Sequence, residues 1–402
     1  MKNMNFKRRL PVPKEIKERY PLTPALAAVK TRRDRELAEI FTGRSGRMVL
    51  LIGPCSADRE DAVLDYCARL AGLQEQVQEK LILVPRVYTN KPRTTGEGYK
   101  GLLHQPDPAG EYDLLEGVIA IRRLHTRVLA ETGLSTADEM LYPADYRYLS
   151  DLLSYVAVGA RSVENQEHRL TASGIDVPVG MKNPTSGDLS VMLNAIQAAQ
   201  GQHTFLYRGW EVETAGNDLA HAILRGYVNR HGESLPNYHY EDLAYLYDAY
   251  RARGLKNMAL IVDANHANSG KRHTEQRRIC KEVLHSSRHS ADIRSLVKGF
   301  MVESYLVDGC QSIGGGVYGK SITDPCIGWE ETQRLVKEIA GMVGEGKCMP
   351  IKPGRGGAVT RPQILPVQNL SQQGEHRFIS LREIRQNCVF RRAGRCPAPT
   401  GR

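Results

Sequence analysis

Two groups of side chains in this sequence have types and spacing that could do chemistry. The first group is cationic and contains Arg86, Lys91, Arg93, Arg161, Lys182 and Arg225. Guanidinium groups bind carboxylate and phosphate oxygens in two-point geometry, and lysine adds a compact point charge. Cations gathered in one place repel each other unless anions lie between them. If these side chains converge, they predict a substrate that carries both phosphate and carboxylate groups.

The second group offers metal ligands and contains Cys55, His266, Glu303 and Asp324. One thiolate, one imidazole and two carboxylates suit a divalent transition metal. The sulfur disfavours magnesium and calcium, and the oxygens disfavour an all-sulfur structural zinc site. Mn, Fe, Co and Zn all suit these donors, so the sequence predicts one divalent ion without choosing among them.

The elements that must position these residues are short β-branched or leucine-rich runs. The predicted strands cover residues 48–52, 81–88, 136–141, 155–161, 177–182, 203–207, 258–263 and 298–303. Predicted helices lie between several of them, at residues 61–78, 112–131, 145–155, 190–200 and 240–253. Strands that alternate with helices predict parallel pairing through crossovers, and eight such strands match a (β/α)8 TIM barrel. A doubly wound open sheet is the alternative, because counting strands does not show closure.

Reactive groups in a TIM barrel lie at the C-terminal ends of the strands and in the loops that follow them. Most residues of both groups lie at such positions in the predicted strands. Glu139 ends the third run, and Lys182 and Glu303 end the fifth and eighth. The sequence therefore places cations and metal ligands at one barrel mouth.

The segments outside the predicted barrel differ from it in composition. The chain has 402 residues, with 55 Lys and Arg against 45 Asp and Glu, for a net charge of +10. Residues 344–402 hold 11 of these basic residues and 3 of the acidic ones, so the barrel itself is nearly neutral. We expect an N-terminal extension at residues 1–45, the catalytic barrel at residues 46–343 and a basic, poorly ordered tail at residues 344–402.

The composition also bears on location and on macromolecular partners. The first 20 residues lack the apolar core of a secretory signal, and no window is long enough to cross a bilayer. Eight cysteines without a CxxC pair do not form a disulfide framework. Within the barrel, basic residues do not cluster with aromatic ones, which argues against nucleic-acid binding. We expect a cytoplasmic protein without a membrane or nucleic-acid partner.

One glycine motif points elsewhere but lacks the context it needs. Gly314-x-Gly316-x-x-Gly319 fits the dinucleotide-binding pattern literally. That motif requires a preceding strand and a later strand with an acidic end, and neither is predicted here. We interpret these glycines as a flexible loop.

The candidate residues lie in motifs that together resemble one enzyme family. The motifs are Ile52-Gly-Pro-Cys-Ser56, Arg86-Val-Tyr88, Lys91-Pro-Arg-Thr-Thr95, Gly159-Ala-Arg161, Val179-Gly-Met-Lys-Asn183, Leu224-Arg-Gly226, Asp263-Ala-Asn-His-Ala-Asn268, Met301-Val-Glu-Ser304 and residues 319–329. They resemble, in order and nearly without gaps, the type I 3-deoxy-D-arabino-heptulosonate-7-phosphate (DAHP) synthases. The resemblance runs from about residue 10 to residue 343.

The resemblance implies a TIM barrel that condenses phosphoenolpyruvate with erythrose 4-phosphate, the first step of the shikimate pathway. It implies that Cys55, His266, Glu303 and Asp324 bind the metal. It implies phosphoenolpyruvate contacts from Arg86, Lys91, Arg161, Lys182 and Arg225, and erythrose 4-phosphate contacts from Arg93, Thr94 and Thr95. Lys91, His266 and Glu139 are the candidates for proton transfer. A homo-oligomer, dimer or tetramer, is also implied.

The nearest rival family is the 3-deoxy-D-manno-octulosonate-8-phosphate synthases, whose barrel and Gly-Pro-Cys loops are similar. The stretch at residues 91–95 and the chain length favour the DAHP synthases. The sequence departs from their feedback-regulated members, which have a small serine at the position of Asp176 and Thr-Pro-Gln at residues 145–147, and are several residues longer between residues 205 and 225. We therefore expect weak or absent inhibition by aromatic amino acids.

Overall fold

Eight parallel strands form one sheet in the computed structural model, which describes residues 2–93 and 95–343. The predicted tail and Thr94 lie outside the described residues. The strand order is β2-β1-β12-β11-β8-β5-β4-β3. The strands are β1 (Met48–Gly53), β2 (Leu81–Pro85), β3 (Thr136–Glu139), β4 (Leu153–Val158), β5 (Val179–Lys182), β8 (His221–Leu224), β11 (Leu260–Asp263) and β12 (Val297–Glu303).

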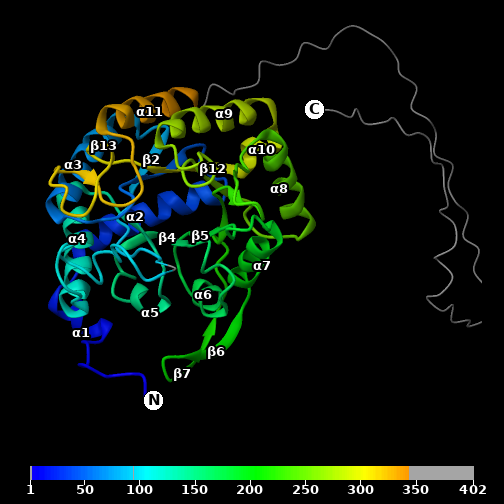
Figure 1. Ribbon diagram of the computed structural model, residues 1–402. Coiled ribbons are helices and arrows are strands. Elements are labelled where there is room, and N and C mark those ends of the chain that lie inside the picture. Colours follow the sequence, from blue (N-terminus) through cyan, green and yellow to red (C-terminus); the bar gives the residue numbers. More distant parts are fainter. Residues whose placement is uncertain (1, 94, 344–402) are drawn as a thin grey trace, which may run out of the picture. The chain divides into compact units, whose positions relative to one another are not determined.

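The two edge strands of this sheet meet. Just beyond β2, Arg86 bridges in parallel to Ala137 of β3, and the Val87 N–H donates to the Ala137 carbonyl at 2.9 Å. The sheet therefore closes as a barrel, and the open-sheet alternative is wrong. Helices surround the barrel (Figure 1). They are α3 (Glu60–Val77), α4 (Leu114–Thr132), α5 (Pro143–Tyr146), α6 (Gln166–Ala172), α7 (Leu189–Gln200), α8 (Tyr240–Ala252), α9 (Gln276–His289), α10 (Ala291–Leu296) and α11 (Trp329–Met342).

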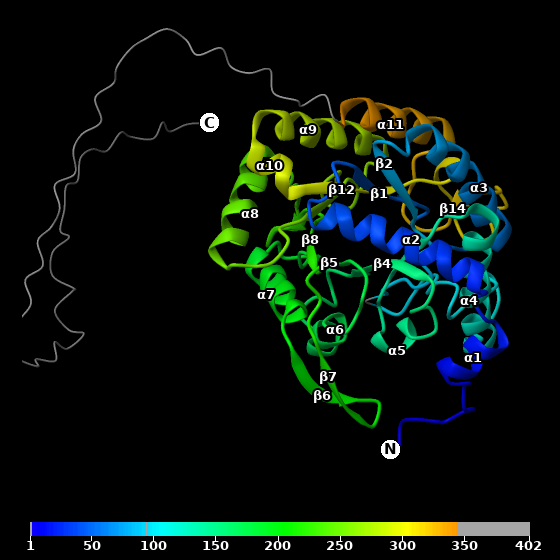
Figure 2. The same ribbon diagram turned by 180° about the vertical axis from the view of Figure 1, so that it is seen from behind.

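The N-terminal segment supplies a lid for the barrel's N-terminal end. It forms α1 (Pro13–Arg19) and α2 (Pro24–Phe41), and Figure 2 shows α2 lying across the barrel. Leu37, Ile40 and Phe41 of α2 are buried in one cluster with inward side chains of the strands. The Phe41 ring lies 4.3 Å from that of His221. Because α2 closes this end, ligands enter from the opposite one.

The barrel interior is filled by side chains. The Tyr155 hydroxyl lies 2.8 Å from Nε2 of His221 inside the barrel. A Cβ added at Gly180 would lie 2.2 Å from this hydroxyl oxygen, so only glycine fits there. The interior is thus a packed core that supports the mouth and not a channel.

The sixth predicted run is a strand, but its predicted place in the barrel was wrong. Residues 203–207 form β6 (His203–Tyr207), which pairs antiparallel with β7 (Trp210–Thr214) in a hairpin outside the barrel. The sixth barrel strand is β8, and Arg225 follows it directly. The predicted helix at residues 145–155 was also wrong, because α5 ends at Tyr146 and β4 begins at Leu153.

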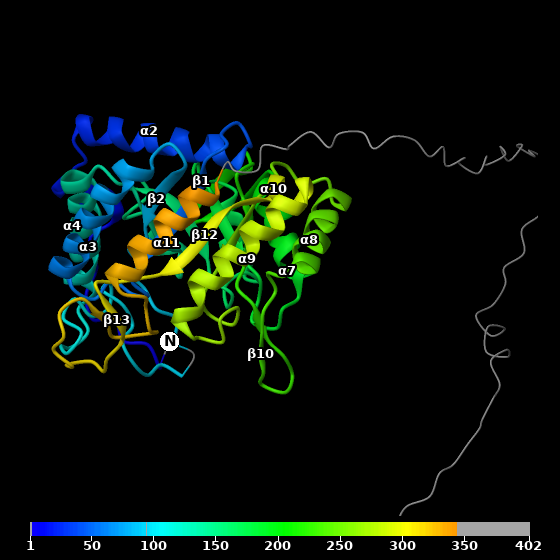
Figure 3. The same cartoon turned by 90° about the horizontal axis from the view of Figure 1, so that it is seen from above.

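Short strands lie within the loops at the C-terminal end of the barrel. They are β9 (Tyr227–Val228), β10 (Ser234–Leu235), β13 (Val307–Cys310) and β14 (Lys320–Ser321), and one 3₁₀ turn spans His273–Glu275. Figure 3 shows β10 and β13 at the end of the barrel opposite α2. Among the described residues, no helix combines the length and apolar composition needed to cross a bilayer.

Candidate active site and metal centre

A cavity of about 150 Å³ lies at the C-terminal ends of the barrel strands. Its lining includes nine of the predicted site residues: Arg86, Lys91, Arg93, Glu139, Arg161, Lys182, Arg225, His266 and Asp324. Thr95 is exposed and does not line the cavity, and Thr94 lies outside the described residues. The structure thus gathers most of the predicted cations around one small space.

Arg86, which is buried, and Arg225, which is partly buried, carry unused donors in this cavity. The Arg86 Nη2 lies 3.2 Å from Oε1 of Glu303, and its guanidinium lies 4.1 Å from the Tyr88 ring centroid. Its Nε and Nη1 groups, and the Nη1 of Arg225, find no hydrogen-bond partner among the described residues. Burial lowers the pKa of Arg225. Buried donors without acceptors are costly, so these groups fit an anionic ligand.

Asp263 at the end of β11 contacts Lys182 and His266. Its Oδ2 lies 3.5 Å from Nζ of Lys182 and 2.8 Å from Nδ1 of His266. Burial works to raise the pKa of Asp263, but His266 and Lys182 outweigh it, so the pKa lies well below its usual value. Lys182 also lies 4.0 Å from Oε2 of Glu139. Asp263 therefore holds the side chains of His266 and Lys182 in place through these two contacts.

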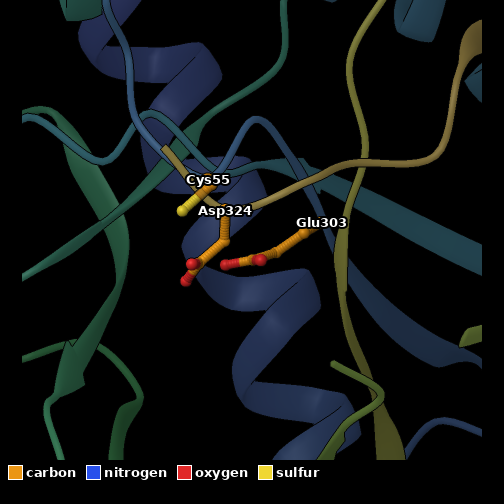
Figure 4. Close-up of side chains that lie close together, drawn as sticks. All are labelled: Cys55, Glu303 and Asp324. Atoms are coloured by element: carbon orange, nitrogen blue, oxygen red, sulfur yellow. The ribbon is translucent and has the colours of Figure 1, made fainter. Parts of the chain in front are cut away.

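Three of the four predicted metal ligands lie together beside this cavity. Ligand atoms of Cys55, Glu303 and Asp324 all lie within 4.8 Å of one another. Figure 4 shows the Cys55 sulfur and the two carboxylates pointing toward a common space. Nε2 of His266 is 3.9 Å from Oε1 of Glu303, at the edge of this group. Like-charged carboxylates at such spacing favour a cation between them, and this donor set fits a divalent transition metal.

Surrounding charges decide the ionisation of the three ligands. Burial and the carboxylates of Glu303 and Asp324 raise the pKa of the Cys55 thiol, while Lys91 acts in the opposite direction. Burial also works against ionisation of Glu303, but His266 and Arg86 outweigh it and lower the pKa of that carboxyl. The site thus holds ionised carboxylates beside a thiol that needs a cation to deprotonate.

Side chains that the sequence did not reveal hold these ligands. The amide of Gln276 donates to the Glu303 carbonyl at 2.8 Å and accepts from its N–H at 2.8 Å. The Asn265 amide donates to Oε2 of Glu303. Amides carry no strand-end signal, although Asn265 and Asp263 both lie in the quoted motif around His266.

The loop that carries Asp324 is tied to the end of β1. The Cys55 N–H donates to the sulfur of Cys326 at 3.4 Å, and the hydroxyls of Ser56 and Thr323 lie 2.9 Å apart. These contacts bring Asp324 beside Cys55 although it lies in the loop after β14 and not at a barrel strand end.

A larger groove lies outside this centre. It measures about 880 Å³ and is lined in part by the glycine-rich loop at residues 313–317, but by none of the predicted site residues. This loop does follow a strand, β13, contrary to expectation, yet it leads into β14 and not into a helix. It therefore lacks the strand-to-helix turn that a dinucleotide-binding motif needs, and its glycines at positive φ serve a tight surface loop.

Comparisons with known proteins agree with this geometry. A family model described as the DAHP synthetase I family matches residues 23–337. The chain is 39% identical over 342 residues to the Trp-sensitive phospho-2-dehydro-3-deoxyheptonate aldolase of Escherichia coli O157:H7, covering 83% of this chain and 95% of that protein. It is 39% identical over 355 residues to the phospho-2-dehydro-3-deoxyheptonate aldolase of Corynebacterium glutamicum, covering 84% and 93% of the two chains.

A solved structure extends the likeness to the fold. The phospho-2-dehydro-3-deoxyheptonate aldolase of Francisella tularensis SCHU S4 superposes with a TM-score of 0.79 at 30% sequence identity, covering 85% of this chain and 98% of that one. Both the barrel and its sequence motifs are therefore shared over nearly the whole length of these proteins. The chain belongs to the DAHP synthetase I family.

Proposed function

We propose that this protein is a metal-dependent DAHP synthase. It condenses phosphoenolpyruvate with erythrose 4-phosphate and water to give DAHP and inorganic phosphate, the first step of the shikimate pathway. The observation that carries the proposal is that Arg86 and Arg225 hold buried, unused N–H groups and line one cavity together with Asp324, a member of the cluster of Cys55, Glu303 and Asp324. Groups that can bind an anion therefore lie next to groups that can bind a metal ion.

The cationic side chains of the cavity suit phosphoenolpyruvate. This substrate carries a phosphate and a carboxylate, and Arg86, Arg161, Lys182 and Arg225 offer the donors to bind both. Their fixed charges also stabilise negative charge that develops as C3 of phosphoenolpyruvate forms a bond to the aldehyde carbon. Water then adds at C2, and the phosphate leaves from that carbon.

Arg93 lies at the outer part of the same cavity and suits the phosphate of erythrose 4-phosphate. Its Nε donates to the Tyr99 carbonyl at 2.8 Å, which leaves its terminal nitrogens for a ligand. The family resemblance gives Thr94 and Thr95 to the same phosphate. Thr95 is exposed in the loop after β2, which is consistent with a second phosphate site near the cavity mouth.

A divalent ion bound by Cys55, His266, Glu303 and Asp324 would supply Lewis-acid polarisation of the aldehyde oxygen. His266 suits this set because Asp263 lies 2.8 Å from its Nδ1, which leaves Nε2 directed toward Glu303. Lys91, His266 and Glu139 all line the cavity and are the candidates for proton transfer, and the Lys91 ammonium lies 3.0 Å from the Cys55 sulfur. Mn, Fe, Co and Zn all remain compatible with these donors.

The test is a phosphate-release assay with both substrates, with and without a chelator. We expect activity with erythrose 4-phosphate, little with arabinose 5-phosphate, and loss on chelation that is restored by added metal. A preference for arabinose 5-phosphate would instead assign the rival synthase activity. Full activity in thoroughly chelated protein would refute the metal assignment alone. The expected homo-oligomer is checked in the same preparation by light scattering coupled to size-exclusion chromatography.

A further inference from the structure

A buried carboxylate beside the cavity links two segments that carry cavity residues. One is the loop that contains Lys91, and the other is the end of β3 at Glu139. Asp138 of β3 is 3% exposed, does not line the cavity and belongs to neither predicted group. We propose that Asp138, together with Thr89, is a positioning device that locks the loop at residues 89–103 against the end of β3, and so sets the places of Lys91 and Glu139. The inference deepens the proposed function and rests on it.

Asp138 accepts three hydrogen bonds from these two segments. Its Oδ1 accepts from the N–H of Thr89 at 3.0 Å and from the N–H of Glu139 at 2.7 Å. Its Oδ2 accepts from the hydroxyl of Thr89 at 2.5 Å. Thr89 itself is completely buried. Because its two oxygens accept from groups on the loop and on β3, this one carboxylate fixes both backbones.

Thr89 is also the point where the two ends of the loop meet. Its carbonyl accepts from the N–H of Leu103 at 3.2 Å. Gly101 packs so closely that an added Cβ would lie 2.3 Å from this carbonyl oxygen. Between these ends the N–H of Lys91 donates to the carbonyl of Lys100 at 3.0 Å. Lys91 and Arg93 therefore project from a loop whose base is held at Thr89.

A histidine closes the space behind the carboxylate. His125 of α4 is completely buried, and its Nδ1 lies 2.7 Å from the Thr136 hydroxyl. Its Nε2 lies 3.6 Å from Oδ2 of Asp138 and has no hydrogen-bond partner within the described part of the chain. Asp138 is thus enclosed between α4 and the loop, and its side chain has little freedom to turn away.

The two residues that this device positions act from opposite sides of the cavity. Lys91 contacts the thiol and carbonyl of Cys55, at 3.0 and 2.9 Å, and Glu139 lies beside Lys182. An error of about 1 Å in such groups costs roughly 100-fold in rate. A residue that touches no substrate can therefore control turnover through their placement.

The experiment compares isosteric variants of Thr89. Thr89→Val removes the hydroxyl and keeps the shape, whereas Thr89→Ser keeps the hydroxyl. Asp138→Asn replaces one acceptor oxygen by an amide donor. Thr171→Val is the matched control, because the Thr171 hydroxyl is buried and no described residue is its hydrogen-bond partner. For each variant we would measure kcat, both KM values, thermal unfolding, and hydrogen exchange of peptides from residues 89–103 and 139–142.

We expect Thr89→Val to lose roughly 10-fold or more in kcat/KM and Asp138→Asn roughly 100-fold, with faster exchange confined to those two segments. Thr89→Ser should restore both readouts, and Thr171→Val should match the wild type. Wild-type kcat, KM and exchange in Thr89→Val, with only a lower unfolding temperature, would overturn the inference. If the wild-type enzyme does not use these substrates, the proposed function fails, and the exchange data alone then decide whether Asp138 holds the loop.

Discussion

The ammonium group of Lys91 lies 3.0 Å from the sulfur of Cys55 and 2.9 Å from the carbonyl oxygen of the same residue. This contact joins the two chemical groups of the site, because Lys91 lies on the substrate-binding wall and Cys55 in the metal-binding cluster. Burial alone would lower the pKa of Lys91, but Cys55 and Glu303 outweigh it and raise that pKa. Lys91 therefore stays cationic beside the thiol and favours its thiolate.

Replacing the thiol should separate metal binding from folding. We expect Cys55→Ala to weaken divalent-metal affinity by at least roughly 100-fold, since losing even an outer partner of a metal ligand costs 10- to 100-fold. Most activity should go with it. Isothermal titration with the metal measures the loss. Cys67→Ala is the control, because Cys67 is equally buried but lies on α3 and is not grouped with the carboxylates. Unchanged metal affinity in Cys55→Ala would contradict the assignment.

Removing one unused arginine should damage phosphoenolpyruvate binding selectively. Arg225→Gln should lower kcat/KM for phosphoenolpyruvate by about 10- to 100-fold, the usual value of a charge-assisted hydrogen bond. The KM for erythrose 4-phosphate should change far less, because Arg93 lies on another loop. Steady-state kinetics with each substrate varied in turn measures the difference. Arg251→Gln, on the exposed face of α8, supplies the control. Equal effects on both substrates would place Arg225 elsewhere in the reaction.

Strand ends predicted which side chains gather at one end of the barrel, because a barrel converts sequence position into spatial position. The eighth strand ends at Glu303, and that placement needed no knowledge of side-chain contacts. The ring of strands was harder to predict at its sixth member. A buried parallel strand reads as a continuous apolar run, but β8 begins with His221, whose imidazole is accommodated by the Tyr155 hydroxyl and the Leu219 carbonyl.

Residues 203–214, which were predicted to include the sixth barrel strand, form a hairpin with a tight turn. Arg208 and Gly209 both have positive φ, 54° and 81°, and form a two-residue turn between β6 and β7. Such turns favour antiparallel hairpins over crossovers. The positioning contacts of Asp138 and Gln276 were not predictable in this way, because they depend on loops whose course no periodicity encodes.

Asp145 should make the free energy of unfolding fall as the pH rises. Burial raises the pKa of this carboxyl to about 6 from 3.8, Arg208 acts against the shift, and Asp138 adds to it. Because the folded state holds the proton more tightly, the free energy of unfolding falls as pH rises from about 4 to 6. The full cost, about 3 kcal/mol at most, is present above pH 6.

Asp145→Asn should remove that cost. We expect a higher free energy of unfolding than wild type at pH 7, with the difference vanishing near pH 3.5, as measured by urea unfolding at several pH values. Asp248→Asn, at an exposed position of α8, should change stability little at any pH. A variant that is less stable than wild type at pH 7 would show that the Asp145 carboxylate has a favourable partner.

Aromatic amino acids should inhibit weakly or not at all. Asp145, Tyr146 and Arg147 occupy α5 and its C-terminal cap, and the Arg147 guanidinium lies 5.9 Å from the Tyr207 ring of the hairpin. Asp176 lies near Tyr146, where it adds to the effect of burial in raising the pKa of that phenol. The carboxylates of Asp145 and Asp176 disfavour the carboxylate of an amino acid beside them. Initial rates with Trp, Phe and Tyr test this, and micromolar inhibition by any of them would contradict it.

Truncation after Val343 should leave catalysis intact. Every predicted site residue precedes this point. Helix α11 ends at Met342, and Val343 is buried in the larger of the two hydrophobic clusters. The removed segment holds 11 basic and 3 acidic residues, so its loss brings the net charge from +10 to +2. Any binding to heparin or DNA should therefore disappear, because such binding depends on the number of cations that contact the polyanion. We expect kcat and both KM values close to those of the full chain, because every predicted site residue is retained. Kinetics and a heparin column, run on both proteins at the same salt concentration, measure the two effects. Lost catalysis in a folded truncated protein would show that the tail contributes to the site.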